Sequence, residues 1–151
     1  MNTFKEGYTI VEILIVLSVL ALVIAVFLPS FQKIREGQVL KNAASEVFSA
    51  LDKARSQGLA SYNSLEYGVH FETNKITIFS GTIYSSSATD NLDIAITLPA
   101  YISAITLTGG AVDLYFDRLS GAPNKTGTIT VSNSSLSKTI TISATGTASM
   151  N

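Results

Sequence analysis

The feature that most constrains this chain is an uncharged apolar stretch close to its start. Residues 13–28 contain no charged side chain, and Ile10 and Val11 extend the apolar run toward the N-terminus. About 20 apolar residues are enough for a helix to cross a bilayer. The stretch therefore predicts a membrane-spanning helix, and any globular part of the chain must follow it.

A single carboxylate, Glu12, lies near the start of this run. An unpaired charge is costly in a membrane, and the chain has no basic residue between Lys5 and Lys33. Cutting the chain after Gly7 would release an α-amino group close enough to serve as the missing cation. The position of Glu12 therefore indicates a processed N-terminus.

A secretory signal peptide or an ordinary signal anchor is the alternative interpretation of this segment. A secretory signal has an apolar core of about 7–15 residues followed by a small-residue cleavage site. Here the apolar run is longer and Pro29-Ser30-Phe31-Gln32 follows it. An ordinary anchor has no use for Glu12 or for Gly7 directly before the span.

The segment Gly7-Tyr8-Thr9-Ile10-Val11-Glu12-Ile13-Leu14 resembles the cleavage and methylation motif of type IV pilins and type II secretion pseudopilins. In that family an aromatic residue, usually Phe, follows the cleaved glycine, and a glutamate comes four residues later. The resemblance implies cleavage after Gly7 by a prepilin peptidase and an N-methylated Tyr8 as the new N-terminus. It also implies an assembly role for Glu12, and the family shares a proline at the position of Pro29.

The resemblance implies four regions: a leader peptide (1–7), a transmembrane or filament-core helix (8–29), its amphipathic continuation (30–60) and a β-rich globular head (61–151). The protein would sit in the bacterial inner membrane as a single-pass protein with its head outside the cytoplasm. It would later join a filament in the periplasm or at the cell surface. Its partners would be other pilin or pseudopilin subunits, prepilin peptidase, the inner-membrane assembly platform and membrane lipid.

The count of Lys and Arg residues on the two sides of the span weakly favours the opposite orientation, with the head in the cytoplasm. The orientation that the resemblance implies is nevertheless the one expected here.

Beyond the span, the pattern predicts that the helix continues with an amphipathic character. Pro29 should bend or loosen it locally, because proline removes a backbone donor. Gly58 is a candidate terminator, with the helix ending between 56 and 60. Apolar residues recur at steps of three and four; they are Phe31, Ile34, Leu40, Ala44, Val47, Phe48, Leu51 and Ala54.

From residue 61 onward the apolar period changes to two, which predicts an antiparallel β-rich head and an α+β fold of the pilin type. A hairpin is expected at Thr73-Asn74, a second at Gly109-Gly110, and polar loops at 80–91 and 120–124. The predicted strands are 65–71, 75–79, 92–98, 101–108, 112–116, 127–131 and 139–143.

Several segments of the head look like the minor pseudopilin H and FimT-like branch. They are Ala54-Arg55-Ser56, Leu98-Pro99-Ala100-Tyr101-Ile102, Leu114-Tyr115-Phe116-Asp117 and Ile140-Thr141-Ile142-Ser143-Ala144-Thr145-Gly146. Members of that branch are minor subunits with a β-rich head. Major pilins commonly close their C-terminal region with a disulfide, which a chain without cysteine cannot form.

The sequence does not indicate an enzyme, a cofactor or a metal site. His70 is the single histidine, so a Ser-His-Asp arrangement is unsupported, and strand alternation places it on the solvent side, opposite Val69 and Phe71. Calcium needs 6–8 oxygen ligands in a loop. The carboxylates Asp90, Asp93, Asp113 and Asp117 are too few to predict such a site.

Two classes of function remain. The first is a structural, minor subunit of a type IV pilus or a type II secretion pseudopilus. The second is a minor pilin whose head binds a ligand, either DNA or a secreted protein. From residue 61 onward the chain has four basic and six acidic residues. This negative balance argues against strong DNA binding. Arg118, Lys125 and Lys138 still leave room for a small basic patch.

Overall fold

One long helix dominates the architecture, as predicted. The computed structural model describes residues 7–151, apart from the side chains of residues 28–30 and 32. Helix α1 (Ile10–Leu59) is 50 residues long and remains helical through Pro29. The chain divides after Arg35 into two compact units, and the second unit comprises Glu36–Asn151. The predicted leader lies outside the described residues except for Gly7.

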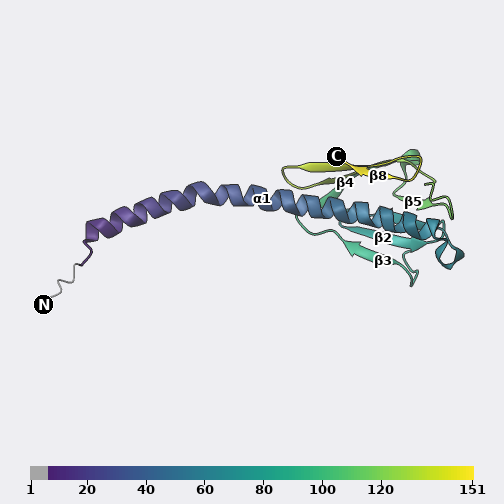
Figure 1. Cartoon of the computed structure of the whole chain (residues 1–151), viewed down its shortest axis with the longest axis horizontal. Helices are drawn as coiled ribbons and strands as arrows, with labels where there is room; N and C mark the ends of the chain where they lie inside the picture. Colours follow the sequence, from purple (N-terminus) through teal and green to yellow (C-terminus); the bar gives the residue numbers. More distant parts are fainter. Residues whose placement is uncertain (1–6) are drawn as a thin grey trace. The chain divides into compact units, whose positions relative to one another are not determined.

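Eight short strands follow α1 and form two antiparallel sheets (Figure 1). Sheet A has the order β3-β2-β1-β5, with β1 (Tyr67–Phe71), β2 (Lys75–Ser80), β3 (Leu92–Ala95) and β5 (Asp113–Phe116). Sheet B has the order β4-β6-β7-β8, with β4 (Tyr101–Leu107), β6 (Gly127–Ser132), β7 (Ser137–Ile142) and β8 (Ala148–Met150). Short 3-10 turns lie at Tyr62–Ser64 and Thr108–Gly110.

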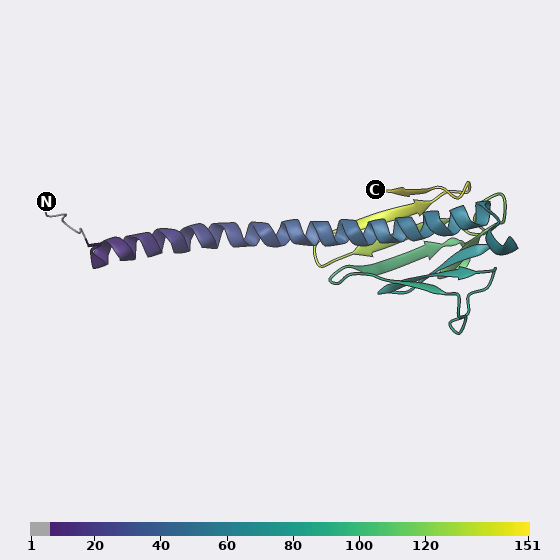
Figure 2. The same ribbon diagram turned by 60° about the horizontal axis from the view of Figure 1, so that its bottom comes forward.

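The sheets pack on the C-terminal half of α1 and share one core with it. In Figures 1 and 2 the strands of both sheets lie alongside the C-terminal half of α1, with β2 and β3 below the helix in Figure 1 and β4 and β8 above it. The buried face of α1 is rich in alanine, which lets the sheets approach the helix closely. Its buried residues are Leu40, Ala43, Ala44, Val47, Ala50, Leu51 and Ala54.

The predicted apolar stripe is correct for most of its length and wrong at its start. Phe31 and Ile34 are 62% and 68% exposed and take no part in this core. Phe48 is only partly buried. Periodicity identifies an apolar face, but it does not say where along the helix the contact with the sheets begins.

Gly58 does not terminate the helix as predicted. It is buried within α1, and a Cβ there would lie 3.3 Å from the carbonyl oxygen of Phe116. Its own carbonyl accepts hydrogen bonds from the N–H groups of Ser61 and Leu119, both at 3.0 Å. The left-handed residue that leads the chain out of the helix is Ser61, with φ 51°. Gly58 is therefore a close-packing glycine.

The hairpin at Thr73-Asn74 is confirmed, because β1 and β2 pair directly and the Glu72 N–H donates to the Lys75 carbonyl at 2.9 Å. The second predicted hairpin, at Gly109-Gly110, is wrong. Both glycines have positive φ as expected, but β4 pairs with β6 and β5 pairs with β1. The turn therefore passes the chain from one sheet to the other. The terminal strand β8 was not predicted.

Candidate assembly site

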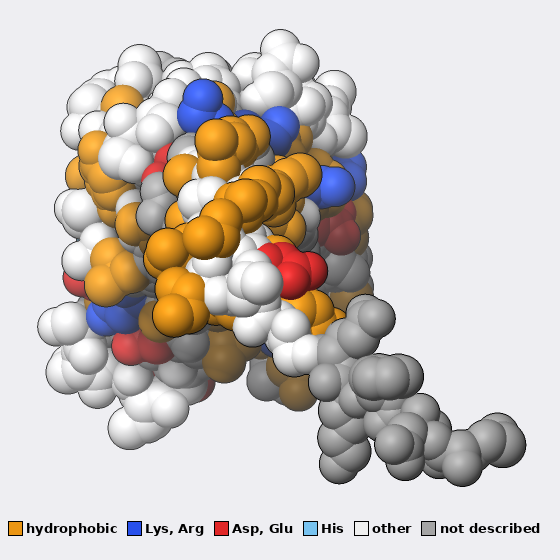
Figure 3. Space-filling model, turned by 90° about the vertical axis from the view of Figure 1, so that its left-hand side faces the viewer, with side chains coloured by type: hydrophobic (Ala, Val, Ile, Leu, Met, Phe, Trp, Pro, Cys, Tyr) orange, Lys and Arg blue, Asp and Glu red, His pale blue; other side chains and the backbone are white. Residues whose placement is uncertain are grey.

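The first half of α1 presents an exposed apolar surface. The segment Ile10–Phe27 has a mean hydropathy of 3.1 and none of it is buried in the described structure. Hydrophobic side chains of this part of the helix face the viewer in Figure 3. The one hydroxyl in its middle, on Ser18, donates to the carbonyl of Ile15 at 2.8 Å. The segment is thus long and apolar enough to cross a membrane and fits a single-pass anchor.

Thr9 caps the start of this helix. Its Oγ1 accepts a hydrogen bond from the Glu12 N–H at 3.2 Å, and its carbonyl accepts one from the Ile13 N–H at 3.2 Å. Thr9 is therefore the N-cap residue and Glu12 the third helical residue. The Thr-x-x-Glu spacing of a capping box was present in the sequence, so this role of Thr9 was recognisable and was missed.

The structure brings three of the four predicted site residues together at this end. Gly7, Tyr8 and Glu12 are exposed, and Tyr8 is 80% exposed. The carboxylate of Glu12 lies in the first turn, where the positive end of the helix dipole stabilises a negative charge. Pro29 is separate from them, within the body of α1. The helix start thus combines an accessible peptide bond with a carboxylate one turn away.

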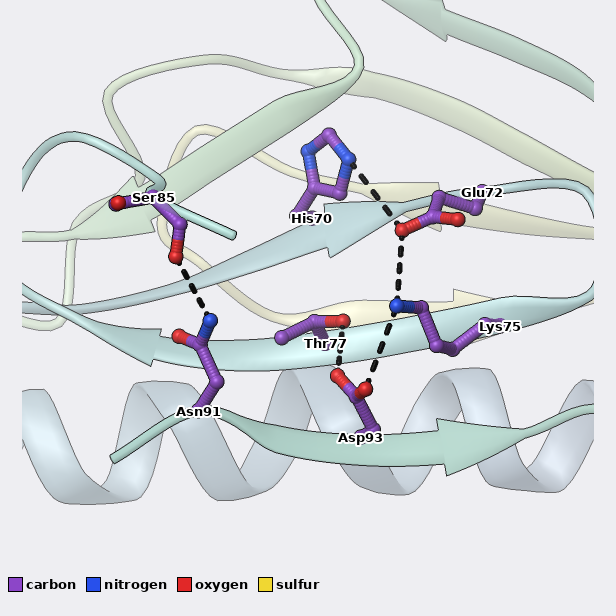
Figure 4. A network of polar contacts seen from close by, with 7 residues as sticks. All are labelled: His70, Glu72, Lys75, Thr77, Ser85, Asn91 and Asp93. Atoms are coloured by element: carbon purple, nitrogen blue, oxygen red, sulfur yellow. Dashed lines mark hydrogen bonds and ion pairs between the residues drawn. The ribbon is translucent and has the colours of Figure 1, made fainter. Parts of the chain in front are cut away.

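On the head, the outer face of sheet A carries a polar network (Figure 4). His70 was predicted to lie on the solvent side of its strand, and it occupies that face, opposite Val69 and Phe71, but it is largely covered. Its side chain is only 16% exposed, because the ring of Tyr84 stacks on it with centroids 3.8 Å apart. The imidazole Nε2 lies 3.9 Å from Oε1 of Glu72. Strand alternation chose the correct face of the sheet but could not foresee that the 81–91 loop folds over it.

Asp93 is the acceptor at the centre of this network. The Thr77 hydroxyl donates to Oδ1 of Asp93 at 2.6 Å, and the Lys75 ammonium donates to Oδ2 at 3.3 Å. The hydrogen bond from Thr77, supported by Lys75, holds the pKa of Asp93 below its ordinary value. Hydrogen bonds to Glu72 and Asp93 raise the pKa of Lys75. The network therefore ties β3 to β2 through an ionised carboxylate.

We expect the stability of the head to fall in acid through Asp93. Since its pKa is lower in the folded state, its stabilising effect is present above the unfolded pKa of about 3.9. The effect is lost as the pH falls through the folded pKa. Thermal unfolding between pH 6 and about pH 2 should show a smaller acid loss in Asp93→Asn than in the wild type. The control Asp52→Asn, an exposed carboxylate on α1, should follow the wild-type curve; overlapping curves for all three proteins would contradict the assignment.

Two of the basic residues predicted to form a small patch bind other groups of the same chain. Lys125 forms an ion pair with Asp113 at 3.0 Å, and Arg118 donates to the carbonyl of Ser64 at 2.9 Å. Within residues 7–151, no group of three or more His, Cys, Asp or Glu side chains is placed to hold a metal ion. Two of the three residues proposed for the patch are thus engaged with other parts of the head.

An apolar helix followed by a helix-packed antiparallel β head defines an α+β fold of the pilin type. The model of the family described as "Type II transport protein GspH" matches residues 43–146, more than half of the 151-residue chain. The chain belongs to this family, which confirms the predicted pseudopilin family and its branch. No curated protein and no solved structure matches the chain. The family match begins after the N-terminal motif, so the roles of Gly7, Tyr8, Glu12 and Pro29 stay predictions.

Proposed function

We propose that this chain is a structural, minor subunit of the pseudopilus of a type II secretion system and not an enzyme. One observation supports this most: an exposed apolar segment of membrane-spanning length belongs to the same helix, α1, whose later part packs in a head of the GspH family. A soluble protein would be expected to bury such a surface. Lipid before assembly, and the helices of neighbouring subunits after it, would cover the apolar side chains.

The proposed assembly pathway of the subunit begins in the inner membrane. The N-terminus lies in the cytoplasm, residues 8–29 cross the bilayer, and the head lies outside the cytoplasm. Prepilin peptidase removes residues 1–7 and the amine of Tyr8 is methylated. An assembly platform in the inner membrane then adds the subunit to a filament beside other pseudopilins. Glu12 and Pro29 act in this last step.

Processing provides the direct test of this proposal. The intact mass of protein isolated from native membranes should show loss of Met1 to Gly7 and gain of one methyl group. Gly7→Val should stop cleavage, because a branched side chain replaces the small residue that lets the backbone enter the protease. Gly7→Ala keeps a small side chain and serves as the control that should still be cleaved. Native protein that retains Met1 to Gly7 would overturn the proposal.

A further prediction concerns Pro29. Because proline cannot donate the intrahelical hydrogen bond at its position, we expect it to let α1 loosen when the subunit passes from lipid into a filament. Pro29→Ala should insert into the membrane normally but enter filaments less often. Quantification of the subunit in membrane and sheared-filament fractions tests this. Equal incorporation of both proteins would show that Pro29 has no role in assembly.

A further inference from the structure

Strand β3 is an open edge of sheet A. It pairs with β2 in a register that places Ile94 opposite Ile76, and the Ile96 N–H continues this ladder to the Asn74 carbonyl at 2.9 Å. Hydrogen-bonded and outward-facing residues alternate along an antiparallel strand. The backbone N–H and C=O groups of Asp93 and Ala95 therefore point away from β2, toward the outside of the sheet.

The opposite edge of sheet A is covered by the chain itself. On β5, the Tyr115 N–H donates to Oδ1 of Asn124 at 2.8 Å, and the Asn124 N–H donates back to the Tyr115 carbonyl at 2.9 Å. Among the described residues, no such loop bonds to the outward groups of Asp93 and Ala95. Figure 1 shows β3 as the outermost strand on its side of α1. Exposed strand edges are ready templates for pairing with another chain.

An open groove of about 350 Å³ adjoins this edge, between α1 and β3. Ile94 forms its wall on the strand side. The helix contributes four residues of one face, spaced at steps of three and four: Asn42, Ser45, Glu46 and Ser49. All of these except Glu46 have short polar side chains. Short side chains on this face leave room for an extended backbone beside β3.

Glu46 is the charged residue of the groove lining. Its Oε2 is buried and has no hydrogen-bond partner among the described residues. Burial raises the pKa of this carboxyl group above its ordinary value. A buried carboxylate oxygen without a partner is unfavourable, and a Lys or Arg side chain is the group that would complement it.

We propose that the edge of β3 receives an extended segment of a second protein chain as an added strand, with a Lys or Arg of that segment reaching Glu46. Main-chain hydrogen bonds to Asp93 and Ala95 would provide affinity, and alternate side chains entering the groove would provide specificity, as in other cases of strand addition. The residue opposite Ile94 points into the groove and carries the cation. This surface does not depend on leader cleavage or filament assembly.

The test uses the full chain in detergent micelles and an end-blocked peptide, Val-Thr-Lys-Thr-Val, whose central Lys and terminal Val residues face the same way. Binding should slow amide exchange at Asp93 and Ala95 and shift their amide resonances. A peptide with Glu in place of the central Lys should bind about tenfold more weakly, the scale of a charged hydrogen bond. Absence of any effect at Asp93 and Ala95, or equal binding of the two peptides, would overturn the proposal.

Two pairs of variants sharpen this test. Ala95→Pro removes an outward N–H and should abolish peptide binding. Ala148→Pro makes the same change on β8, where the bond from the Ser143 N–H to the Thr147 carbonyl at 3.0 Å fixes Ala148 as outward-facing, and it should leave binding intact. Glu46→Gln should remove the preference between the peptides, whereas Asp52→Asn should retain it. Equal binding by both proline variants would refute the strand addition.

The probe itself can also be changed, in case Ala95→Pro fails to fold. A Lys peptide that is N-methylated at the amides facing β3 cannot complete the ladder, so it should not bind the wild-type protein. The same peptide methylated on its opposite edge should bind as the unmodified peptide does. Equal binding of the two methylated peptides would refute the backbone pairing without any change to the protein.

Discussion

Glu12→Ala is expected to reach the membrane and lose its leader normally, yet to be missing from sheared filaments. In the proposed pathway membrane insertion would depend on the apolar span and cleavage on Gly7, and the substitution leaves both unchanged. In the filament, Glu12 would meet the Tyr8 amine of its own or a neighbouring subunit within an apolar core. Removing one partner of a buried ion pair costs about 3–5 kcal/mol, which corresponds to more than about a hundredfold in incorporation.

A second role for Glu12 must be separated from this pairing. The hydrogen bond from the Glu12 N–H to Thr9 places its side chain at the position that completes a capping box, and Gln serves there as well as Glu. Glu12→Gln is therefore the decisive control. If the charge pairs with an amine, Gln should fail as Ala does; if the side chain only supports the cap, Gln should assemble like the wild type. Subunit counts from sheared filaments of the three strains distinguish these outcomes.

Gly127→Ala is expected to destabilise the head strongly. Gly127 begins β6 with φ 151°, and an added Cβ would lie 2.0 Å from the carbonyl oxygen of Thr106 on β4. Because that atom belongs to the neighbouring backbone, no side-chain rotation relieves the clash, and the two strands must separate. We expect a loss of about 3 kcal/mol, which lowers the midpoint of thermal unfolding by about 15 °C for a domain of this size.

Gly109→Ala provides the matched comparison. Gly109 also has a positive φ, of 80°, but nothing lies within 4 Å of an added Cβ. Only the strain of a left-handed alanine remains, about 1 kcal/mol, or roughly 5 °C. Circular dichroism of both variants in detergent measures the difference. Equal midpoints would mean that the close approach of β4 and β6 does not limit stability.

The parts of this fold that were predictable are those encoded by local pattern. The long helix, the Thr73-Asn74 hairpin and most strand positions follow from hydrophobic periodicity and turn residues over short windows. The family was also recognisable, because its motifs are contiguous in the sequence. The outcome at Gly109-Gly110 shows the limit: the local conformation was correct, but strand partners are chosen by packing between distant segments. The terminal strand β8 has only three residues and little periodicity to detect.

The features missed in the unit Glu36–Asn151 depend on loops and strand edges. Glu46 reads as a solvent-facing charge on a helical wheel, and only the approach of β3 turns its surroundings into a groove. His70 reads as an exposed strand residue until Tyr84 covers it. In both cases the decisive neighbour is distant in sequence or lies in a polar loop without regular periodicity. Sequence patterns indicate which face of an element a residue occupies, but not what covers that face.

The Thr9 cap means that α1 carries its own starting signal. The hydrogen bonds that begin the helix run from Glu12 and Ile13 to Thr9, the second residue after the bond expected to be cut. Removal of the leader would therefore change the charge at the end of the helix without unwinding it. A protease acting there would change the charge beside a helix that is already formed, and the first turn of α1 would keep its hydrogen bonds after cleavage.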